Sequence, residues 1–339
     1  MSSIPRVSPA FILFSLISLS FFASTSFAVE LRLDPTKVEG PNACGECHKE
    51  SVLSWKKTHH ASTFKTLPRT KKAKEITKKM GLKRIKSGSD CLTCHFTSAE
   101  TKQKTKPIAG ISCESCHGAG KDWMDLHSDF GGKNITAENE TPAHKKQRWE
   151  DAEAAGMIRP TDLYAVAQNC YSCHTVPNEK LVNVGGHPAG SKFELVRWSQ
   201  GELRHNVWYS DENNEAPVER KRLMFILGKA LDLEFAYRGL AKATKKANYA
   251  VAMAKRAKVA SKHLASINKL IAVSELSEII ALNSQIKLKL NNETAYLTAA
   301  KKVGKLSQQF AQKYDGSQFA AIDKYLPKSK KYKGKVYHP

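Results

Sequence analysis

Aromatic residues and acids are scarce in this 339-residue chain, and long apolar runs are almost absent. Aromatic side chains make up 8% of the residues, and 32 Asp and Glu stand against 54 Lys and Arg, which leaves a formal charge of +22. The longest apolar run lies at the extreme N-terminus, which excludes a protein with several membrane spans. Hydrophobic residues still make up 41% of the chain. Because this fraction is enough for a packed core, the composition also excludes wholesale disorder.

The first 28 residues have the pattern of an export signal. Arg6 is the only charged residue before Glu30, an apolar run follows over residues 10–23, and small residues at Ser26 and Ala28 offer a cleavage site. These are the parts of a secretory signal, and the run falls short of the ~20 residues that a membrane-spanning helix needs. The sequence therefore predicts an exported protein, periplasmic or associated with the cell envelope, where thiols do not stay free without a reason.

No cysteine stands outside one repeated five-residue motif, Cys-x-x-Cys-His. The four copies contain Cys44, Cys47 and His48, then Cys91, Cys94 and His95, then Cys113, Cys116 and His117, and finally Cys170, Cys173 and His174. Two thiols at this spacing can form thioethers with the vinyl groups of a porphyrin, and the adjacent histidine then binds the iron. Zinc ribbons, redox dithiols and disulfides also use paired cysteines, but none of them requires this histidine. The sequence therefore predicts four covalently attached c-type haems.

The four motifs lie close together, all within residues 44–174. So little chain surrounds each haem that the haems must supply much of the core themselves. We expect a mainly α, multihaem cytochrome c domain with short helices and long loops, such as the Lys-rich loop at residues 102–107. Haems packed this closely lie within electron-transfer range of one another.

The second axial ligand of each iron has to come from elsewhere in the chain. The histidines outside the motifs are His59, His60, His127, His144, His187, His205, His263 and His338. Histidine is preferred to the available methionines, Met80, Met124 and Met157, because this part of the chain is rich in histidine. A spare histidine is often a surface residue, and we expect this of His263 and His338.

The sequence around the motifs is also distinctive. The first motif runs into Ser54-Trp-Lys-Lys-Thr-His-His-Ala61, and the third lies within Gly110-Ile-Ser-Cys-Glu-Ser-Cys-His-Gly-Ala-Gly120, with His127 ten residues after the motif. His205 follows the fourth motif by 31 residues. In this order and spacing, residues 42–209 resemble the tetrahaem cytochrome c-554 family, the c-554/c-prime group.

The resemblance implies an electron-transfer protein in which three haems have two histidine ligands. The pairs that it implies are His48 with His205, His117 with His60, and His174 with His127. The second haem, on His95, is five-coordinate in the family and would be open here as well.

The family pattern assigns no ligand role to two further histidines, His187 and His59. His187, within Gly185-Gly-His-Pro188, has no counterpart there, and the loop from His95 to Cys113 is shorter than the family's. His187 either closes the second site or is a turn residue, since Gly-Gly and Pro are typical of a turn. His59 is expected to be a bystander next to His60.

The composition changes after the last motif. From residue 217 to about 314 there is no further proline and no cysteine, and apolar residues recur every four positions at Leu223, Leu227, Leu231 and Phe235. This spacing indicates one apolar face of a helix. We expect two to four helices that pack as a hairpin or bundle against the haem domain. The predicted division is an export signal over 1–28, a tetrahaem domain over 29–212, a helical domain over 213–325 and a basic tail over 326–339.

The C-terminal region is rich in cations that have no acid near them in the sequence. They are Lys242, Lys245, Lys246, Lys255, Arg256, Lys258 and Lys262, and in the tail Lys328, Lys330, Lys331, Lys333 and Lys335. Such runs form either a solvated face or a docking surface for an acidic redox partner or an anionic membrane. Nucleic acid also fits the charge, but the predicted export argues against it.

These features favour an exported tetrahaem c-type cytochrome that transfers electrons between redox partners through mostly bis-histidine haems. Two alternatives stay open. One is a haem enzyme that reduces or oxidises a small nitrogen compound at an open second haem, and the other is an interaction module whose basic helices tether the haems to a partner complex. The sequence assigns no catalytic residue.

Overall fold

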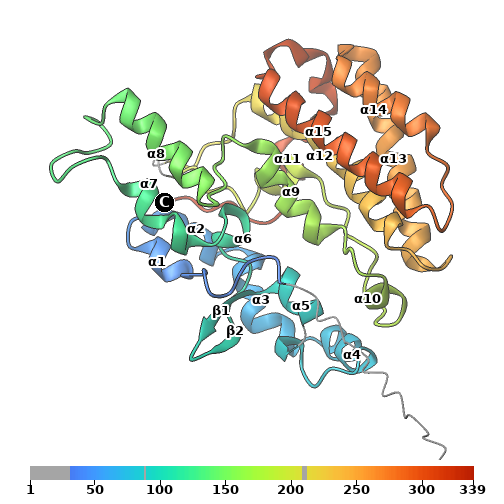
Figure 1. Ribbon diagram of the computed structural model, residues 1–339, viewed down its shortest axis with the longest axis horizontal. Coiled ribbons are helices and arrows are strands. Elements are labelled where there is room, and N and C mark those ends of the chain that lie inside the picture. Colours follow the sequence, from blue (N-terminus) through green and yellow to red (C-terminus); the bar gives the residue numbers. More distant parts are fainter. Residues whose placement is uncertain (1–30, 88, 208–211) are drawn as a thin grey trace, which may run out of the picture.

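The computed structural model of the chain describes residues 31–87, 89–207 and 212–339. The predicted export signal lies outside these residues. Within them the fold is mainly helical, as predicted, and the strands form one two-stranded sheet (Figure 1). No helix in those three ranges is long and apolar enough to cross a membrane.

Short helices joined by loops make up the part of the chain that carries the motifs. The α-helices there are α1 (Pro41–Gly45), α2 (Lys49–Lys56), α3 (His59–Thr66), α4 (Lys71–Lys79), α5 (Ser89–His95), α6 (Glu114–His117), α7 (Met124–Ser128), α8 (Pro142–Ala154), α9 (Leu163–His174), α10 (Glu179–Asn183) and α11 (Leu195–Ser199). Short 3₁₀ turns are η1 (Leu67–Arg69), η2 (Ile85–Ser87) and η3 (Gly120–Asp122). The side chains of Thr58, Thr70 and Asp162 each accept a hydrogen bond from a backbone N–H three residues on, which stabilises the first turn of α3, α4 and α9.

Residues 102–107, predicted as a loop, lie mostly in a strand. β1 (Thr97–Thr101) pairs antiparallel with β2 (Lys104–Ala109). Lys102 and Gln103 link the two strands, and both have positive φ angles, 50° and 57°. Two left-handed residues in succession reverse the chain with the twist that a hairpin requires, so the Lys-rich segment pairs with β1.

The four motifs occupy helical turns. His95, His117 and His174 are the last residues of α5, α6 and α9, and His48 is the N-cap residue of α2, three residues after the end of α1. A helical turn places residues three apart on one face of the helix. Both cysteines of a motif therefore point to the same side.

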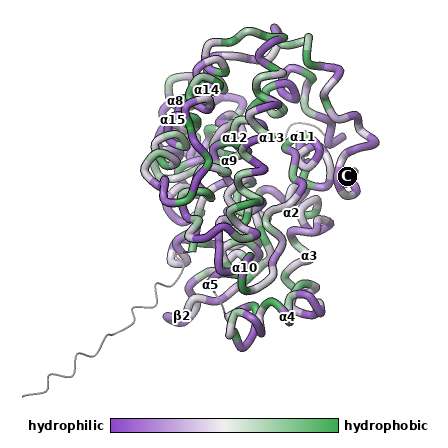
Figure 2. The backbone as a smooth tube through the Cα atoms, turned by 90° about the vertical axis from the view of Figure 1, so that its right-hand side faces the viewer, coloured by the Kyte–Doolittle hydropathy of each residue, from purple (hydrophilic) through white to green (hydrophobic). Residues whose placement is uncertain are grey.

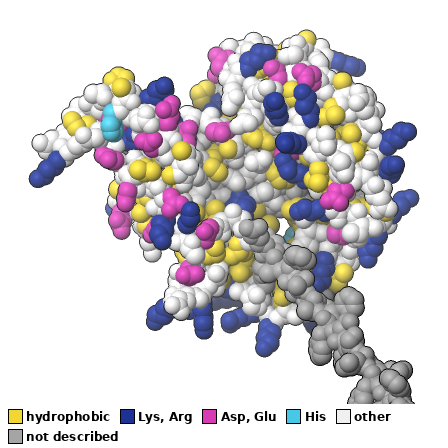
Figure 3. Space-filling view, in the orientation of Figure 1, with side chains coloured by type: hydrophobic (Ala, Val, Ile, Leu, Met, Phe, Trp, Pro, Cys, Tyr) yellow, Lys and Arg dark blue, Asp and Glu magenta, His cyan; other side chains and the backbone are white. Residues whose placement is uncertain are grey.

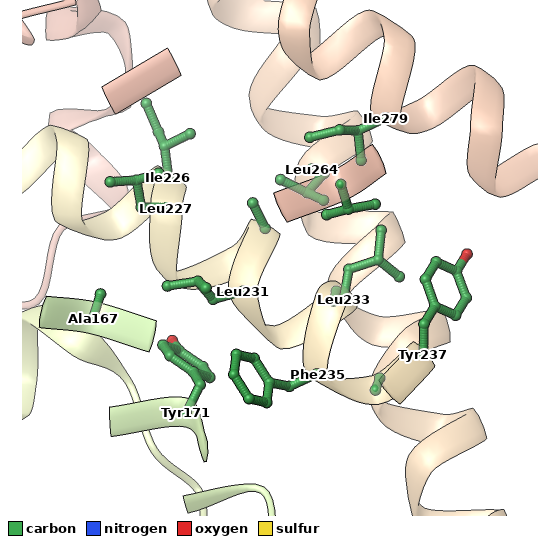
Figure 4. Packing of buried hydrophobic residues seen from close by; sticks show 14 of the residues in the cluster. Ala167, Tyr171, Ile226, Leu227, Leu231, Leu233, Phe235, Tyr237, Leu264 and Ile279 are labelled. Atoms are coloured by element: carbon green, nitrogen blue, oxygen red, sulfur yellow. The ribbon is translucent and has the colours of Figure 1, made fainter. Parts of the chain in front are cut away.

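Four longer helices follow the motifs. They are α12 (Val218–Ala241), α13 (Asn248–Ile271), α14 (Ser274–Gln285) and α15 (Glu293–Lys313), after which come the 3₁₀ segments η4 (Ser317–Tyr325) and η5 (Ser329–Lys331). α12 packs against both α13 and α15. Leu227 and Leu231, on the predicted apolar face of α12, are fully buried (Figure 4). The periodicity of the sequence thus locates the central helix of this bundle.

The bundle packs directly on the helix that carries the fourth motif. One cluster of buried residues joins Ala167 and Tyr171 of α9 to α12. The Tyr171 ring lies 6.3 Å from that of Phe235, and a Cβ atom at Gly228 would lie 2.9 Å from the Tyr171 hydroxyl oxygen. The predicted division at residue 213 stays a prediction, but the apolar packing continues across it.

The motif-bearing end of the molecule has much smaller apolar clusters. Figures 1 and 2 place the bundle at one end, and α4, α5 and the hairpin at the other. One cluster there consists of Ala73, Ile85, Cys91, Leu92 and Phe96, and another of Ile76, Met80 and Leu181. Clusters of this size are expected where a prosthetic group fills part of the interior.

Candidate haem centres

Each motif histidine lies opposite one distant histidine. The ring centroids are 6.2 Å apart for His48 and His127, 6.2 Å for His174 and His60, 6.2 Å for His95 and His187, and 6.3 Å for His117 and His205. The eight residues are the four motif histidines and the four other histidines that the sequence singled out as candidate ligands. The chain therefore forms four two-histidine sites.

The spacing of the pairs fits a metal ion between the rings. An imidazole nitrogen binds a metal ion at about 2 Å and lies about 1 Å from the centre of its ring, so two imidazoles on opposite sides of one ion have centroids about 6 Å apart. The interplanar angles range from 21° to 85° while the centroid distances differ by only 0.1 Å. A shared ion would be compatible with this combination, because it would fix the two nitrogens but leave each ring free to rotate about its metal–nitrogen axis.

Most of these rings already use one nitrogen in a hydrogen bond. The Nδ1 contacts are His117 with the Ile158 carbonyl oxygen at 2.9 Å, His127 with that of Met124 at 2.5 Å, His187 with that of Pro188 at 2.9 Å, His205 with that of Leu203 at 2.7 Å, and His174 with the Ser191 hydroxyl at 3.0 Å. A carbonyl partner makes Nδ1 the proton donor and leaves Nε2 as the metal-binding atom, which is the usual arrangement around metal-bound histidine.

Burial keeps several of the paired rings neutral. It lowers the pKa of His60, His95 and His174 to about 4 in each case, because the charged imidazolium loses hydration. Only the neutral ring has a lone pair for a metal ion. Near neutral pH these side chains are therefore in the state that ligation requires.

The four motifs lie next to one another in the fold. The Cys44 thiol is hydrogen-bonded to Cys113, and the Cys94 thiol to Cys173. These contacts raise the pKa of Cys113 and Cys94 and lower that of their partners, since one thiol of each pair donates to the other. The first motif thus lies beside the third, and the second beside the fourth. The third also meets the fourth, because Asn169 Nδ2 donates to the Cys116 carbonyl oxygen at 2.9 Å.

Buried donors without a partner lie next to two of the pairs. The Nε1 atoms of Trp123 and Trp198 are buried with no hydrogen-bond partner among the described residues. Trp123 packs edge-on against His127, and Trp198 lies against His174, each with centroids 5.2 Å apart. Buried donors are normally paired, so these positions suit a bound group that carries acceptors, such as the carboxylates of haem.

Three of the observed pairs differ from those that the resemblance implies. His127, not His205, faces His48; His205, not His60, faces His117; and His60, not His127, faces His174. The reason lies in contacts between segments far apart in the chain. The buried Glu114 carboxylate of the third motif accepts hydrogen bonds at 2.8 Å from the backbone N–H groups of Glu39, Gly40 and Gly120. It thereby joins the start of α1 to the turn before α7 and brings His127 to the first motif.

A buried ion pair holds α7 in this position. Arg148 of α8 donates to both oxygens of the Glu140 carboxylate, at 2.7 and 2.6 Å, and to the backbone carbonyl oxygen of His127 at 2.6 Å. The same carboxylate contacts His144 Nδ1 at 2.8 Å. His144 thus belongs to the support of the first site rather than to one of the four pairs.

The sequence left His187 open between a ligand and a turn residue, and the structure places it in a turn with its ring opposite a motif histidine. The ring faces His95, and its neighbour Gly186 has a φ of 73° in a tight turn. His59, by contrast, lies outside the four pairs. Its Nδ1 contacts Glu202 at 2.7 Å, and 83% of its side chain is exposed.

Comparison with known proteins agrees with the resemblance seen in the sequence. Residues 43–118 match the family model described as cytochrome c554 and c-prime. A 112-residue stretch is 35% identical to "Cytochrome c-554" of Nitrosomonas europaea, and this alignment covers 31% of the present chain and 48% of that protein. No solved structure matches the chain. The family is one of c-type cytochromes, which supports covalent haem as the cofactor, and the resemblance of the N-terminal part of this chain to the cytochrome c554 and c-prime family is confirmed.

Proposed function

We propose that this protein is an exported tetrahaem c-type cytochrome that transfers electrons between redox partners. The observation that carries the proposal is the set of four imidazole pairs, each made of one motif histidine and one distant histidine at 6.2–6.3 Å. Each pair would bind one iron, and the two cysteines of the same motif would attach its porphyrin. Haem bound in this way supplies an iron ion that alternates between the ferric and ferrous states.

The chain holds at least one ring of each pair through a hydrogen bond to Nδ1. Backbone carbonyls orient His117, His127, His187 and His205 through Nδ1. Ligands held this firmly stay the same in both oxidation states, so little rearrangement accompanies electron transfer. The contacts of Cys44 with Cys113 and of Cys94 with Cys173 bring neighbouring sites together, as transfer from site to site requires.

The alternative of a haem enzyme requires an open coordination position at the second site. His187 faces His95 at the same distance as in the other three pairs. We therefore propose that the second site is closed by His187, and we assign no catalytic residue.

The cofactor count and the coordination can be tested together. Mass spectrometry of the mature protein should show four haem additions, and its absorption spectrum should be entirely low-spin and unchanged by carbon monoxide. One high-spin haem that binds carbon monoxide would favour the enzyme instead. Fewer than four additions would contradict the tetrahaem proposal.

The partners are proposed to be acidic redox proteins, which an exported chain with a formal charge of +22 would attract. Residues 71–87, over α4 and η2, carry eight Lys and Arg and a single acid, Glu75. Lys and Arg side chains line the lower edge of the molecule in Figure 3, where Figure 1 places α4 and the hairpin. A Cβ atom at Gly186 would lie 3.5 Å from Lys79 Nζ, so this basic face adjoins the second site.

The basic stretch that the sequence emphasised, on α13, is less uniform. Arg256 is half-buried and pairs with Asp232 at 2.5 Å, and it also donates to the Ser191 carbonyl oxygen at 3.1 Å. It therefore joins α13 to α12 instead of facing a partner. The lysines around it are exposed. Because Arg256 is used within the fold, the basic face of α13 consists of these lysines alone and is weaker than that of residues 71–87.

Two charge-reversal variants distinguish these faces. Lys71, Lys74 and Lys78 are changed to Glu in one, and Lys255, Lys258 and Lys262 in the other. Electron delivery to a periplasmic extract is measured from low to high salt, with vesicles of anionic lipid as a second substrate for binding. Docking at α4 predicts that only the first variant slows, by roughly 10-fold or more at low salt. Slowing of the second variant alone would place docking on the bundle, loss of vesicle binding would indicate a membrane surface, and no change in either would contradict charge-guided docking.

A further inference from the structure

The C-terminal tail lies across the segment that carries His205. The Lys333 backbone N–H donates to the Arg197 carbonyl oxygen at 2.8 Å, and the Lys333 carbonyl oxygen accepts from the Glu202 N–H at 2.8 Å. Arg197 Nε donates to the Lys331 carbonyl oxygen at 2.9 Å. The tail is therefore bound through its backbone, although its sequence suggests a surface run of lysines.

Two glycines allow this close approach. A Cβ atom at Gly201 would collide with the backbone carbonyl of Lys333, and one at Gly334 would collide with the carboxylate of Glu202. Gly334 also has a φ of 74°, a conformation that other residues rarely adopt. The two segments fit together only because each has a glycine at the point of contact.

A buried asparagine connects the tail to the residues next to His205 through hydrogen bonds. Asn213 is fully buried, and its Nδ2 donates to the carbonyl oxygens of Tyr337 at 2.8 Å and of Arg204 at 2.9 Å. Its Oδ1 accepts from the Asn206 N–H at 2.8 Å. The residues on both sides of His205 are thus hydrogen-bonded to the Asn213 side chain, which is also hydrogen-bonded to the tail.

Further hydrogen bonds fix the tail at both of its ends. Tyr337 Oη donates to the Glu50 carboxylate at 3.0 Å, two residues after His48, and Tyr332 Oη donates to the Glu215 carboxylate at 2.8 Å. His205 itself is exposed and lies outside any helix or strand. An exposed loop would lose much conformational entropy on presenting a ligand, and a preformed loop avoids this loss.

We propose that residues 328–339 act as a strap that positions His205 as the axial ligand opposite His117. The inference rests on the proposed function, in which His205 binds an iron. The positive charge of the strap is incidental to this role, because the contacts are made by backbone atoms, by two tyrosine hydroxyls and by Asn213.

Truncation of the holoprotein after Pro327 tests the strap. η4 stays in place, because Phe319 and Ile322 are buried in the bundle core. We expect one of the four haems to become high-spin and to bind carbon monoxide, while the intact protein binds none. Gly334→Val should give the same spectrum, since it forces the strap away from Glu202 without shortening the chain. A wholly low-spin spectrum in both variants would overturn the inference.

Two controls make the result specific. Changing Lys328, Lys330 and Lys335 to Gln removes three of the five lysine charges of the strap but none of the contacts described above, and should leave the spectrum low-spin. In a His205→Ala background, truncation should open no further haem, because the same site is already open. A second carbon monoxide-binding haem there would show general loosening of the fold and overturn the inference. Failure of the proposed function is separate, since the intact protein would then lack four low-spin haems.

Discussion

The motif-bearing part of the molecule and the helical bundle are held together in different ways. The bundle has one extended cluster of buried apolar residues that includes fully buried Leu227, Leu231 and Leu264. Apart from the fourth motif, which packs on the bundle, the apolar clusters around the motifs contain only a few residues, and long-range hydrogen bonds such as those of Glu114 and Arg148 join the segments. The bundle therefore resembles an ordinary globular core, whereas the motif-bearing part is joined mainly by polar contacts around the proposed haem sites.

Removal of the cofactors should produce the largest difference in stability between the two parts. With all eight motif cysteines changed to Ser, the attachment points are lost, and the structure around them loses the groups that fill its interior. We expect protease to cut quickly within residues 44–160 and to leave a resistant fragment that contains residues 163–325. Limited proteolysis with mass spectrometry measures this, with the intact holoprotein as control. Equal resistance of both parts would contradict the comparison.

A cavity in the bundle should have the next largest effect and should spare the haem spectrum. Leu231→Ala removes a fully buried side chain, which typically costs about 2–5 kcal/mol of unfolding free energy. Val251→Ala on α13 is the matched control, because 54% of that side chain is exposed and its loss should cost about 0.5 kcal/mol or less. Denaturant unfolding monitored by circular dichroism gives both values. A shift in the spin state of Leu231→Ala at low denaturant would show that the bundle core and the sites are not independent.

The Glu140–Arg148 pair should make a smaller contribution that depends on pH. The Arg148 guanidinium lowers the pKa of the Glu140 carboxyl to about 2. A carboxyl whose pKa is lower in the folded state stabilises the protein above its unfolded pKa, about 4.3, and this contribution disappears as pH falls through the folded value. Glu140→Gln should therefore be less stable than the parent at pH 7, with the difference shrinking between pH 4 and pH 2.

The control for this measurement lies on α8, the helix that carries Arg148. Glu150 pairs with Lys146 at 3.6 Å, and both side chains are largely exposed, so Glu150→Gln should change the urea midpoint little at any pH. If Glu140→Gln behaves like Glu150→Gln at pH 7, the ion pair does not support α7 and the first site.

The sequence alone predicted the elements that depend on local pattern. Short helices around the Cys-x-x-Cys-His motifs were expected, and the four-residue spacing of Leu223, Leu227, Leu231 and Phe235 locates α12. His187 shows the limit of such patterns, because the Gly-Gly-His-Pro turn predicts a bend without saying what the bend faces. Only the fold places it opposite His95.

The pairing of the histidines could not be predicted, because it depends on contacts between distant segments. Glu114 brings α7 to the first motif through backbone groups some 75 residues away in the chain. Asn213 and Tyr337 support His205 through a contact that spans 124 residues. Nothing in the local sequence of these residues marks such partners, and the lysines of the tail suggest a charged surface rather than a strap.

Iron-edge anomalous diffraction from crystals of the holoprotein tests the four-pair arrangement most directly. We predict four iron peaks, each lying between the two rings of one pair, with His127, His187, His205 and His60 opposite His48, His95, His117 and His174 respectively. A peak beside His95 without His187 on its far side, or His48 facing His205 across an iron, would contradict this arrangement.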